Sequence, residues 1–125
     1  MKTTRTNLFR LGALATAAGI FILSSFSTLP MPPTPLISPD KLAHFIVFGA
    51  LAFFTCFWFE EEEWKRKPLR TGIIVFLLLS LYGASDEFHQ YFVPGRQVSF
   101  WDWVADSLGA VGGIGVFWAF VMVKK

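Results

Sequence analysis

Four long apolar runs, separated by short polar or proline-rich segments, divide the chain. They extend over about residues 8–29, 40–59, 71–91 and 101–123. Each run holds roughly 20 residues, enough for a helix rising about 1.5 Å per residue to cross a hydrocarbon core of about 30 Å. The pattern predicts an all-α, polytopic membrane protein: a single membrane domain over 1–125, built as a bundle of four transmembrane helices.

The three connections differ in character. Residues 30–39 are rich in proline, which lacks a backbone donor and fixes φ, so they predict an extended linker. Residues 60–70 carry blocks of acidic and then basic side chains and predict a hydrated, charged loop. Pro94 and Gly95 predict a turn within 92–100.

The first run permits two interpretations. Lys2 and Arg5 before an apolar middle, with small residues near its end, are loosely typical of a secretory signal peptide. The length of the run and the lack of a clean A-x-A cleavage site favour a helix that is retained in the membrane. We therefore predict that the first helix is retained. Its removal would not change the direction in which the other three helices cross the membrane.

Basic residues are distributed unevenly between the two sides that these helices define. The side with both termini and the 60–70 loop has nine: Lys2, Arg5, Arg10, Lys65, Arg66, Lys67, Arg70, Lys124 and Lys125. The other side has Lys41 and Arg96. The positive-inside rule therefore predicts a protein of the cytoplasmic (inner) membrane, with both termini and the 60–70 loop inside, and the linker and turn outside.

Composition agrees with a membrane protein and excludes several other classes. Hydrophobic residues make up 54% of the chain, charged residues 16%, and the mean hydropathy is +0.51. A net charge of +2 without a basic stripe argues against nucleic-acid binding. The single cysteine, Cys56, excludes an intrachain disulfide and a cysteine-based metal motif. The lipid bilayer is the one partner that composition indicates; protein partners and oligomeric state are left open.

Ionisable and amide side chains collect at the outward ends of three predicted helices. We call this set the polar layer: Asp40, Lys41, His44, Asp86, Glu87, His89, Gln90, Arg96, Asp102 and Asp106. A charged side chain at bilayer depth costs roughly a few kcal/mol unless it pairs, is hydrated or lines a cavity. We therefore predict that the polar layer forms an outward-facing site.

Residue spacing predicts which of these side chains share a helix face. Asp86, His89 and Gln90 lie at i, i+3 and i+4, on one face, whereas Glu87 lies about 100° away around the helix. Asp40 can cap the helix that starts near Lys41, because its carboxylate can accept from free amide groups of the first turn.

In the last helix, polar and small residues form one stripe. Asp102, Asp106, Gly109 and Gly113 lie at i, i+4, i+7 and i+11. Gly109 and Gly113 make a GxxxG pair, which lets two helix backbones approach closely in lipid. We therefore predict that these two glycines pack against another helix.

The charges of the polar layer do not balance. Five acidic residues against Lys41 and Arg96 leave a net charge of −3 when both histidines are neutral. We expect Arg96 to pair with an acid, some groups to hold extra protons, or a cation to bind. The sequence contains no metal-binding motif, and we predict no cofactor.

Two segments resemble a known family. DKLAHFIVFGAL at 40–51 and DEFHQYFVPGRQVSFWDWVADSLGAVGG at 86–113 are similar to the VanZ-like family of small bacterial membrane proteins. The matching positions are Asp40, Lys41, His44, Asp86, Glu87, Gln90, Pro94, Gly95, Arg96, Asp102 and Gly109. The chain departs from the family pattern at Asp106, where asparagine is frequent. The resemblance implies a place in the cell envelope and a link to tolerance of the glycopeptide teicoplanin, and it implies no reaction.

Three functions fit this pattern. The first is binding of a lipid headgroup, a cell-wall precursor headgroup or a cation by the polar layer. The second is an intramembrane enzyme acting on a lipid-linked substrate by carboxylate and histidine acid-base chemistry. No nucleophile motif, HExxH spacing or phosphate-binding glycine loop supports it, so catalytic residues are not assigned and we lean against an enzyme. The third is a structural polar network that fixes helix order.

Overall fold

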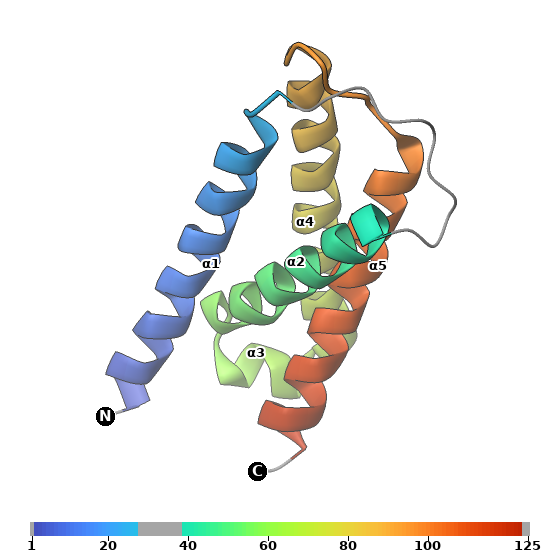
Figure 1. The fold of residues 1–125 in the computed structure, drawn as a ribbon. Coiled ribbons are helices and arrows are strands. Elements are labelled where there is room, and N and C mark those ends of the chain that lie inside the picture. The colour runs from blue at the N-terminus through green and yellow to red at the C-terminus, as the bar shows by residue number, and fades with distance from the viewer. Residues whose placement is uncertain (1, 28–38, 124–125) are drawn as a thin grey trace.

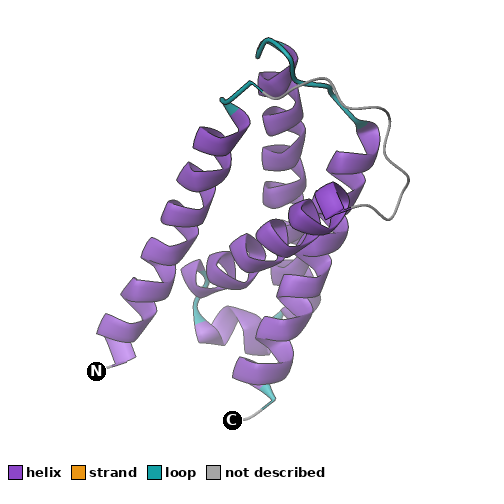
Figure 2. Ribbon diagram, in the orientation of Figure 1, coloured by secondary structure: helices purple, strands orange, loops and turns teal. Residues whose placement is uncertain are grey.

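The computed structural model describes residues 2–27 and 39–123, and every regular element in these ranges is helical (Figures 1 and 2). The long helices are α1 (Lys2–Ser24), α2 (Pro39–Thr55), α4 (Pro68–Tyr91) and α5 (Phe100–Phe117). A 3₁₀ turn (η1, Cys56–Trp58) extends α2, and a π-helical turn (η2, Trp118–Met122) extends α5. The short helix α3 (Glu61–Arg66) precedes α4.

Among the described residues, four helical spans are long and apolar enough to cross a membrane: Thr3–Ser24, Pro39–Trp58, Pro68–Tyr91 and Phe100–Met122. Their outer surfaces expose large apolar side chains, among them Leu8, Leu14, Leu81, Phe88 and Leu108. Water-soluble proteins rarely expose apolar patches of this extent, whereas lipid tails cover them without penalty. The predicted all-α membrane fold with four transmembrane helices is confirmed.

The first helix has different bounds from the predicted 8–29. It begins at Lys2, because the backbone hydrogen bonds of a helix continue through polar residues as readily as through apolar ones. It ends at Ser24, where the Ser25 hydroxyl donates to the carbonyl of Phe21 and the Phe26 amide bonds the carbonyl of Leu23. Such local bonds tighten and end a helix. The predicted linker, apart from Pro39, lies outside the described residues.

The charged connection is mostly helical, which corrects the predicted loop over 60–70. Acids occupy the first turn of α3 and Lys65 and Arg66 its last turn, so both ends complement the helix dipole. Lys65 also donates to Glu61 one turn earlier, at 2.8 Å. Pro68 then opens α4 at its first turn, where a missing amide hydrogen costs nothing.

Helices α2 and α5 cross in direct backbone contact. A Cβ built at Gly109 would overlap the carbonyl oxygen of Phe45, and one at Gly113 would overlap that of Gly49. The absence of side chains at these two glycines therefore sets how closely the helices approach. On the other side of α5, the Trp103 indole donates to the carbonyl of Ser80 and holds α4.

Helix α1 lies against α2 and α4. The ring of Phe9 stacks on Phe57 with centroids 4.3 Å apart, and the Tyr82 hydroxyl donates to the carbonyl of Ala17 at 2.6 Å. The start of α1 and the end of η2 lie at the same end of the bundle as α3, which we call the α3 end (Figure 1). The α4–α5 turn and the last turn of α1 lie at the opposite end, which we call the polar end.

Candidate functional site

A buried ion pair joins the first turns of α2 and α5. Lys41 and Asp102 are only 7% and 5% exposed, and the Lys41 Nζ lies 2.5 Å from Asp102 Oδ1. Asp40, which is more exposed, places Oδ2 at 3.6 Å from the same ammonium group. The carboxylate of Asp102 also lies in the first turn of α5, where the helix dipole favours negative charge. Lys41 is therefore the cation of the α2–α5 contact.

One turn deeper, His44 bridges the same two helices. Its Nδ1 lies 2.8 Å from Asp106 Oδ1, and its Nε2 faces Asp102 Oδ2 at 3.8 Å and Asp40 Oδ1 at 4.0 Å. The spacing of i to i+3 on α2 and i to i+4 on α5 places the two contacts one above the other. The imidazole thus lies among three carboxylates.

Asp86 and Gln90 lie on α4 and face α1. The Gln90 amide donates from Nε2 to Asp86 Oδ2 at 3.0 Å and approaches the Ser24 hydroxyl at 3.4 Å. Both side chains are buried, so these hydrogen bonds replace the ones that water would supply. The pair forms the α4 wall of the polar layer.

Glu87 is buried against the start of α5. It follows Asp86 on α4, so its side chain points about 100° away around the helix. Its Oε2 accepts from the backbone amide of Ser99 at 3.1 Å, next to the first turn of α5. Its Oε1 and the Oδ2 of Asp106 are buried and have no hydrogen-bond partner among the described residues. Such atoms are rare in folded proteins and call for an explanation.

Arg96 does not pair with an acid, and that expectation is wrong. It donates from Nε to the carbonyl of Phe26 at 3.0 Å and from Nη2 to that of Leu23 at 2.7 Å. Within residues 2–27 and 39–123 it forms no ion pair. The carbonyls at the end of α1 lack the i+4 amide partners of a helix interior and carry the negative end of the helix dipole, so they attract the guanidinium. Gly95 makes this turn with a φ of 80°.

His89 also contacts α1 and not the other polar-layer side chains. Its Nε2 lies 3.1 Å from the Ser25 hydroxyl, and its ring lies 4.7 Å from that of Phe21. Its partner on α1 is thus Ser25, adjacent to the Ser24 that Gln90 approaches. Spacing along a helix predicts which side chains share a broad face, but not which residue of a neighbouring helix each one contacts.

Three residues that the sequence did not single out shape the site. Ser24 and Ser25 bring α1 into the polar layer, and their occurrence together at the end of an apolar run was the available signal. Gly83 lies beside Asp106: a Cβ there would be 3.1 Å from Asp106 Oδ2. No signal in the sequence marked Gly83, because it lies within an ordinary apolar run.

A small cavity opens between α1, α2 and α4 at the polar end. Its volume is about 140 Å³. Polar side chains from several elements line it: Ser24, Asp40, His44, Asp86, Gln90 and Arg96. Apolar side chains, including Leu23, Val47 and Phe48, complete the wall. The cavity therefore offers both charge and apolar contact.

A protein-family model described as VanZ/LLP1 matches residues 3–122. The chain belongs to the VanZ-like family. Searches of curated proteins and of solved structures gave no match. The predicted family is confirmed, and the matched range includes α1, which the two motif segments did not cover.

In this VanZ-like protein, the motif residues make two sets of contacts that meet at the cavity. Lys41, His44, Asp102 and Asp106 join α2 to α5, whereas Gln90 and Arg96 bond to α1. His44 lines the same cavity as Asp86, Gln90 and Arg96. Asp106, where the family pattern often has asparagine, is fully buried against His44. Its extra negative charge is thus enclosed between helices.

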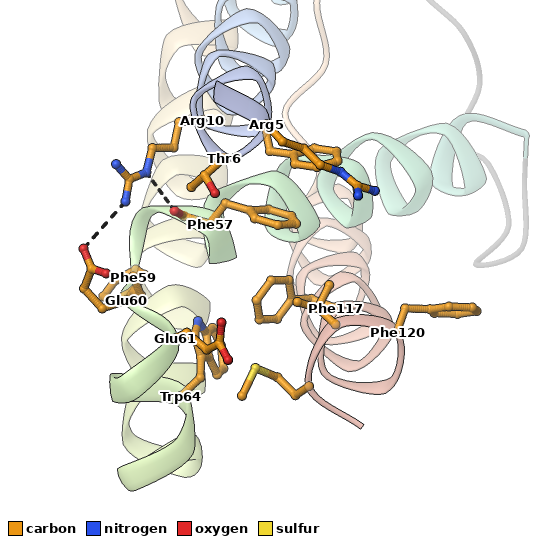
Figure 3. A pocket seen from close by; sticks show the side chains of 13 residues that line it. Arg5, Thr6, Arg10, Phe57, Phe59, Glu60, Glu61, Trp64, Phe117 and Phe120 are labelled. Carbon is orange, nitrogen blue, oxygen red and sulfur yellow. Dashed lines mark hydrogen bonds and ion pairs between the residues drawn. The ribbon is translucent and has the colours of Figure 1, made fainter. Parts of the chain in front are cut away.

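A second and larger cavity of this VanZ-like protein lies at the α3 end, with a volume of about 680 Å³ (Figure 3). Arg5, Arg10 and Glu60 lie on its rim, and aromatic rings such as Phe57 and Phe117 form its wall. Arg10 donates to the carbonyl of Phe57 at 2.8 Å. Among its described lining residues there is no cluster of buried charges comparable with the polar end.

Proposed function

We propose that this VanZ-like protein lies in the cytoplasmic membrane of a bacterium, with both termini inside and the polar end outside. The distribution of nine basic residues against two between the two sides supports this orientation. The start of α1, the end of η2 and α3 lie at one end of the bundle, which agrees with this orientation. The 140 Å³ cavity then opens at the outer leaflet.

We further propose that this cavity binds the polar headgroup of a lipid or lipid-linked cell-wall precursor. The proposal rests on one observation: Asp86, Gln90 and Arg96 meet apolar side chains of α1 and α2 around a cavity at a helix end. Apolar walls with a few convergent polar groups are typical of ligand sites. A lipid headgroup has the matching chemistry, polar at one end and attached to an apolar chain at the other.

The size and charge of the cavity restrict the ligand. Pockets for whole drug-sized molecules measure roughly 300–1,000 Å³, so about 140 Å³ takes one group of a headgroup and leaves the rest in the interface. Asp40 and Asp86 accept hydrogen bonds from hydroxyl, amide or ammonium groups. Arg96 at the rim suits a phosphate or carboxylate because its planar guanidinium donates in pairs. A phosphate carrying a sugar or an amine offers both.

The test compares lipid binding to the wild-type protein and to Asp86→Asn. Asparagine keeps an oxygen for the Gln90 amide, so the change removes charge and retains the hydrogen bond. We expect binding of phosphatidylethanolamine, whose ammonium group can donate to Asp86, in phosphatidylcholine nanodiscs, measured by native mass spectrometry. A hydrogen bond to a charged group contributes about 1.5–3 kcal/mol, so affinity should fall roughly tenfold or more.

Glu62→Gln is the matched control, because it removes an exposed acid at the α3 end. It should leave lipid binding unchanged. Equal binding by the wild type and Asp86→Asn, or no retained lipid in either, would overturn the headgroup proposal. If the ligand is a cell-wall precursor, cells with Asp86→Asn in place of the wild type should also lose teicoplanin tolerance, measured as the minimum inhibitory concentration.

A further inference from the structure

Three helices bring one metal-binding group each to a common point. A ring nitrogen of His44 from α2 and carboxylate oxygens of Glu87 from α4 and Asp106 from α5 lie within 4.8 Å of one another. Glu87 is 6% exposed and Asp106 is fully buried. One oxygen of each, Glu87 Oε1 and Asp106 Oδ2, has no hydrogen-bond partner among the described residues. Two such buried oxygens beside one imidazole need either a cation or a hydrogen-bond donor.

The neighbouring group of acids has its own cation. Asp40, His44 and Asp102 also lie within 4.8 Å of one another, but the Lys41 ammonium lies 2.5 Å from Asp102 and 3.6 Å from Asp40. A second cation there would meet like charge. No lysine or arginine bonds to Glu87 or Asp106 in the described part of the chain. The group of His44, Glu87 and Asp106 is therefore the one without a lysine or arginine partner among the described residues.

We propose that His44, Glu87 and Asp106 bind a divalent first-row transition-metal ion of the Zn²⁺ or Mn²⁺ kind. One imidazole nitrogen and two carboxylates are ligands that suit such ions, which bind nitrogen and oxygen at about 2.0–2.2 Å. Atoms separated by up to 4.8 Å can surround an ion at these distances with small side-chain adjustments. A charge of +2 also offsets most of the net −3 of the polar layer.

The surroundings of His44 match those of a metal-bound histidine. Such a histidine usually donates its second ring N–H to a carboxylate, which fixes the ring and strengthens the ligand. When Nδ1 faces the ion beside Asp106, Nε2 faces the carboxylates of Asp102 and Asp40 at 3.8 and 4.0 Å. Gly83 keeps space beside Asp106 Oδ2, which a side chain at position 83 would reduce.

This site differs from the headgroup cavity in its residues. Glu87 and Asp106 do not line that cavity, and His44 is the one residue that the two share. Metal binding therefore goes beyond headgroup binding. Loss of one can be measured while the other is retained.

The direct test uses the full chain, purified in detergent and freed of metal with a chelator. Mn²⁺ is added and the electron paramagnetic resonance signal of the free ion is followed, with Zn²⁺ as the competitor. We expect the free-ion signal to fall by the equivalent of one bound Mn²⁺ per chain. Addition of Zn²⁺ should displace the bound Mn²⁺ and restore the signal. A free-ion signal that stays undiminished at millimolar Mn²⁺, together with no binding of Zn²⁺ by calorimetry, would overturn the site without any variant.

Two variants locate the ion. Glu87→Gln keeps an oxygen for the Ser99 amide and removes one charged ligand, whereas Asp40→Asn keeps all three ligands and changes only a carboxylate 4.0 Å from His44 Nε2. Loss of a group that merely supports a ligand weakens metal binding about 10–100-fold, so loss of a ligand should weaken it at least tenfold. Asp40→Asn should change affinity less than Glu87→Gln. Weakening by Asp40→Asn alone would place the ion elsewhere and refute the assignment.

A shared proton is the competing account of the two oxygens. Infrared spectroscopy distinguishes it, because a protonated carboxyl group has a C=O stretch that a metal-bound carboxylate lacks. We expect any such band from Glu87 or Asp106 to disappear on addition of Zn²⁺. A band that persists at saturating Zn²⁺ and is removed by Glu87→Gln would show a proton in place of the ion and overturn the proposal.

Discussion

The two ends of the bundle hold the same kinds of charged side chain in opposite surroundings. At the polar end, Lys41 and Asp102 form a pair with side chains 8% and 7% exposed. At the α3 end, the side chains of Lys65 and Glu61 are 53% and 41% exposed, and Arg10 meets a Glu60 that is 82% exposed. Water screens the second set and hardly reaches the first.

Helix approach explains the difference. At the α2–α5 crossing, glycines let the backbones touch, so a short aspartate on one helix reaches a lysine or histidine on the other. At the α3 end the helices are held apart by aromatic rings, such as Trp64 against Phe117 with centroids 5.0 Å apart (Figure 3). Long charged side chains there lie at the rim, in contact with water.

In this protein, a charged side chain contributes most to stability where the helix backbones lie close together. A buried pair depends on both partners, because removal of one leaves the other dehydrated and unpaired. An exposed pair contributes little, because water replaces the lost partner. Substitutions that remove one charge at each end should therefore differ widely in effect.

The largest effect is expected for Lys41→Met. Methionine fills a similar volume and removes the ammonium group, which leaves Asp102 buried without its cation. Breaking a buried pair in this way costs about 3–5 kcal/mol, so the free energy of unfolding should fall by about that amount. Unfolding by sodium dodecyl sulfate, followed by circular dichroism, measures it.

Lys67→Met is the matched control for Lys41→Met, since Lys67 is exposed at the α3 end. It should leave the unfolding midpoint unchanged. Equal losses from the two substitutions would show that burial of the Lys41 pair has no special role, and the contrast between the ends would be lost.

The next largest effect is expected for Gly109→Ala. The added methyl group overlaps the backbone of Phe45, and a backbone cannot move aside as a side chain can. Overpacking of this kind costs about 1–3 kcal/mol, and separation of α2 from α5 should also lengthen the His44–Asp106 contact. Unfolding measurements and the NMR shifts of the His44 ring report the two consequences.

Gly115→Ala controls for the helix propensity of alanine, because a Cβ at position 115 meets no atom within 4 Å. It should be neutral or stabilise the helix by up to about 1 kcal/mol. A Gly109→Ala protein as stable as Gly115→Ala would mean that the backbones are not in contact at this crossing.

The fold was predictable because the length of an apolar run is a direct measure of a membrane span. The four spans follow from runs of roughly 20 residues, and only the ends differ. Helix α3 was missed because the alternation of charge blocks between Glu60 and Arg70 is equally typical of a loop. Its helical form depends on local pairs such as Lys65 with Glu61 and on the packing of Trp64, and packing is not visible in a charge pattern.

The sequence predicted which residues belong to the candidate site, but not which of them contact one another. Spacing put Asp102 and Asp106 on one face, but the rotation and tilt of neighbouring helices decide which cation reaches them. Lys41 reaches Asp102, while Arg96 bonds to the end of α1. The group of His44, Glu87 and Asp106 was also missed, because its members come from three helices and leave no short motif.

A moderate effect is expected for Arg96→Gln. The substitution removes a cation that donates to the last carbonyls of α1, at Leu23 and Phe26. Because the contact is partly hydrated, the loss should be about 1 kcal/mol. Hydrogen exchange in the last turn of α1 should accelerate by about tenfold or less. Arg10→Gln, which removes the bond to Phe57 near the α3 end, should leave that turn protected. Acceleration by both variants alike would mean that α1 opens as one unit.

The smallest effect is expected for Glu61→Gln at the α3 end. The hydrogen bond and charge of Glu61 raise the pKa of Lys65 above its usual 10.5. Stability from this pair is therefore present below pH 10.5 and is lost as the pH rises through the folded-state pKa. Glu61→Gln should lower the Lys65 pKa toward 10.5, measured by NMR of its side chain, with no measurable change in the unfolding midpoint at neutral pH. A clear drop in that midpoint would show that an exposed pair stabilises this protein as a buried one does, and exposure could then no longer explain the difference between the two ends.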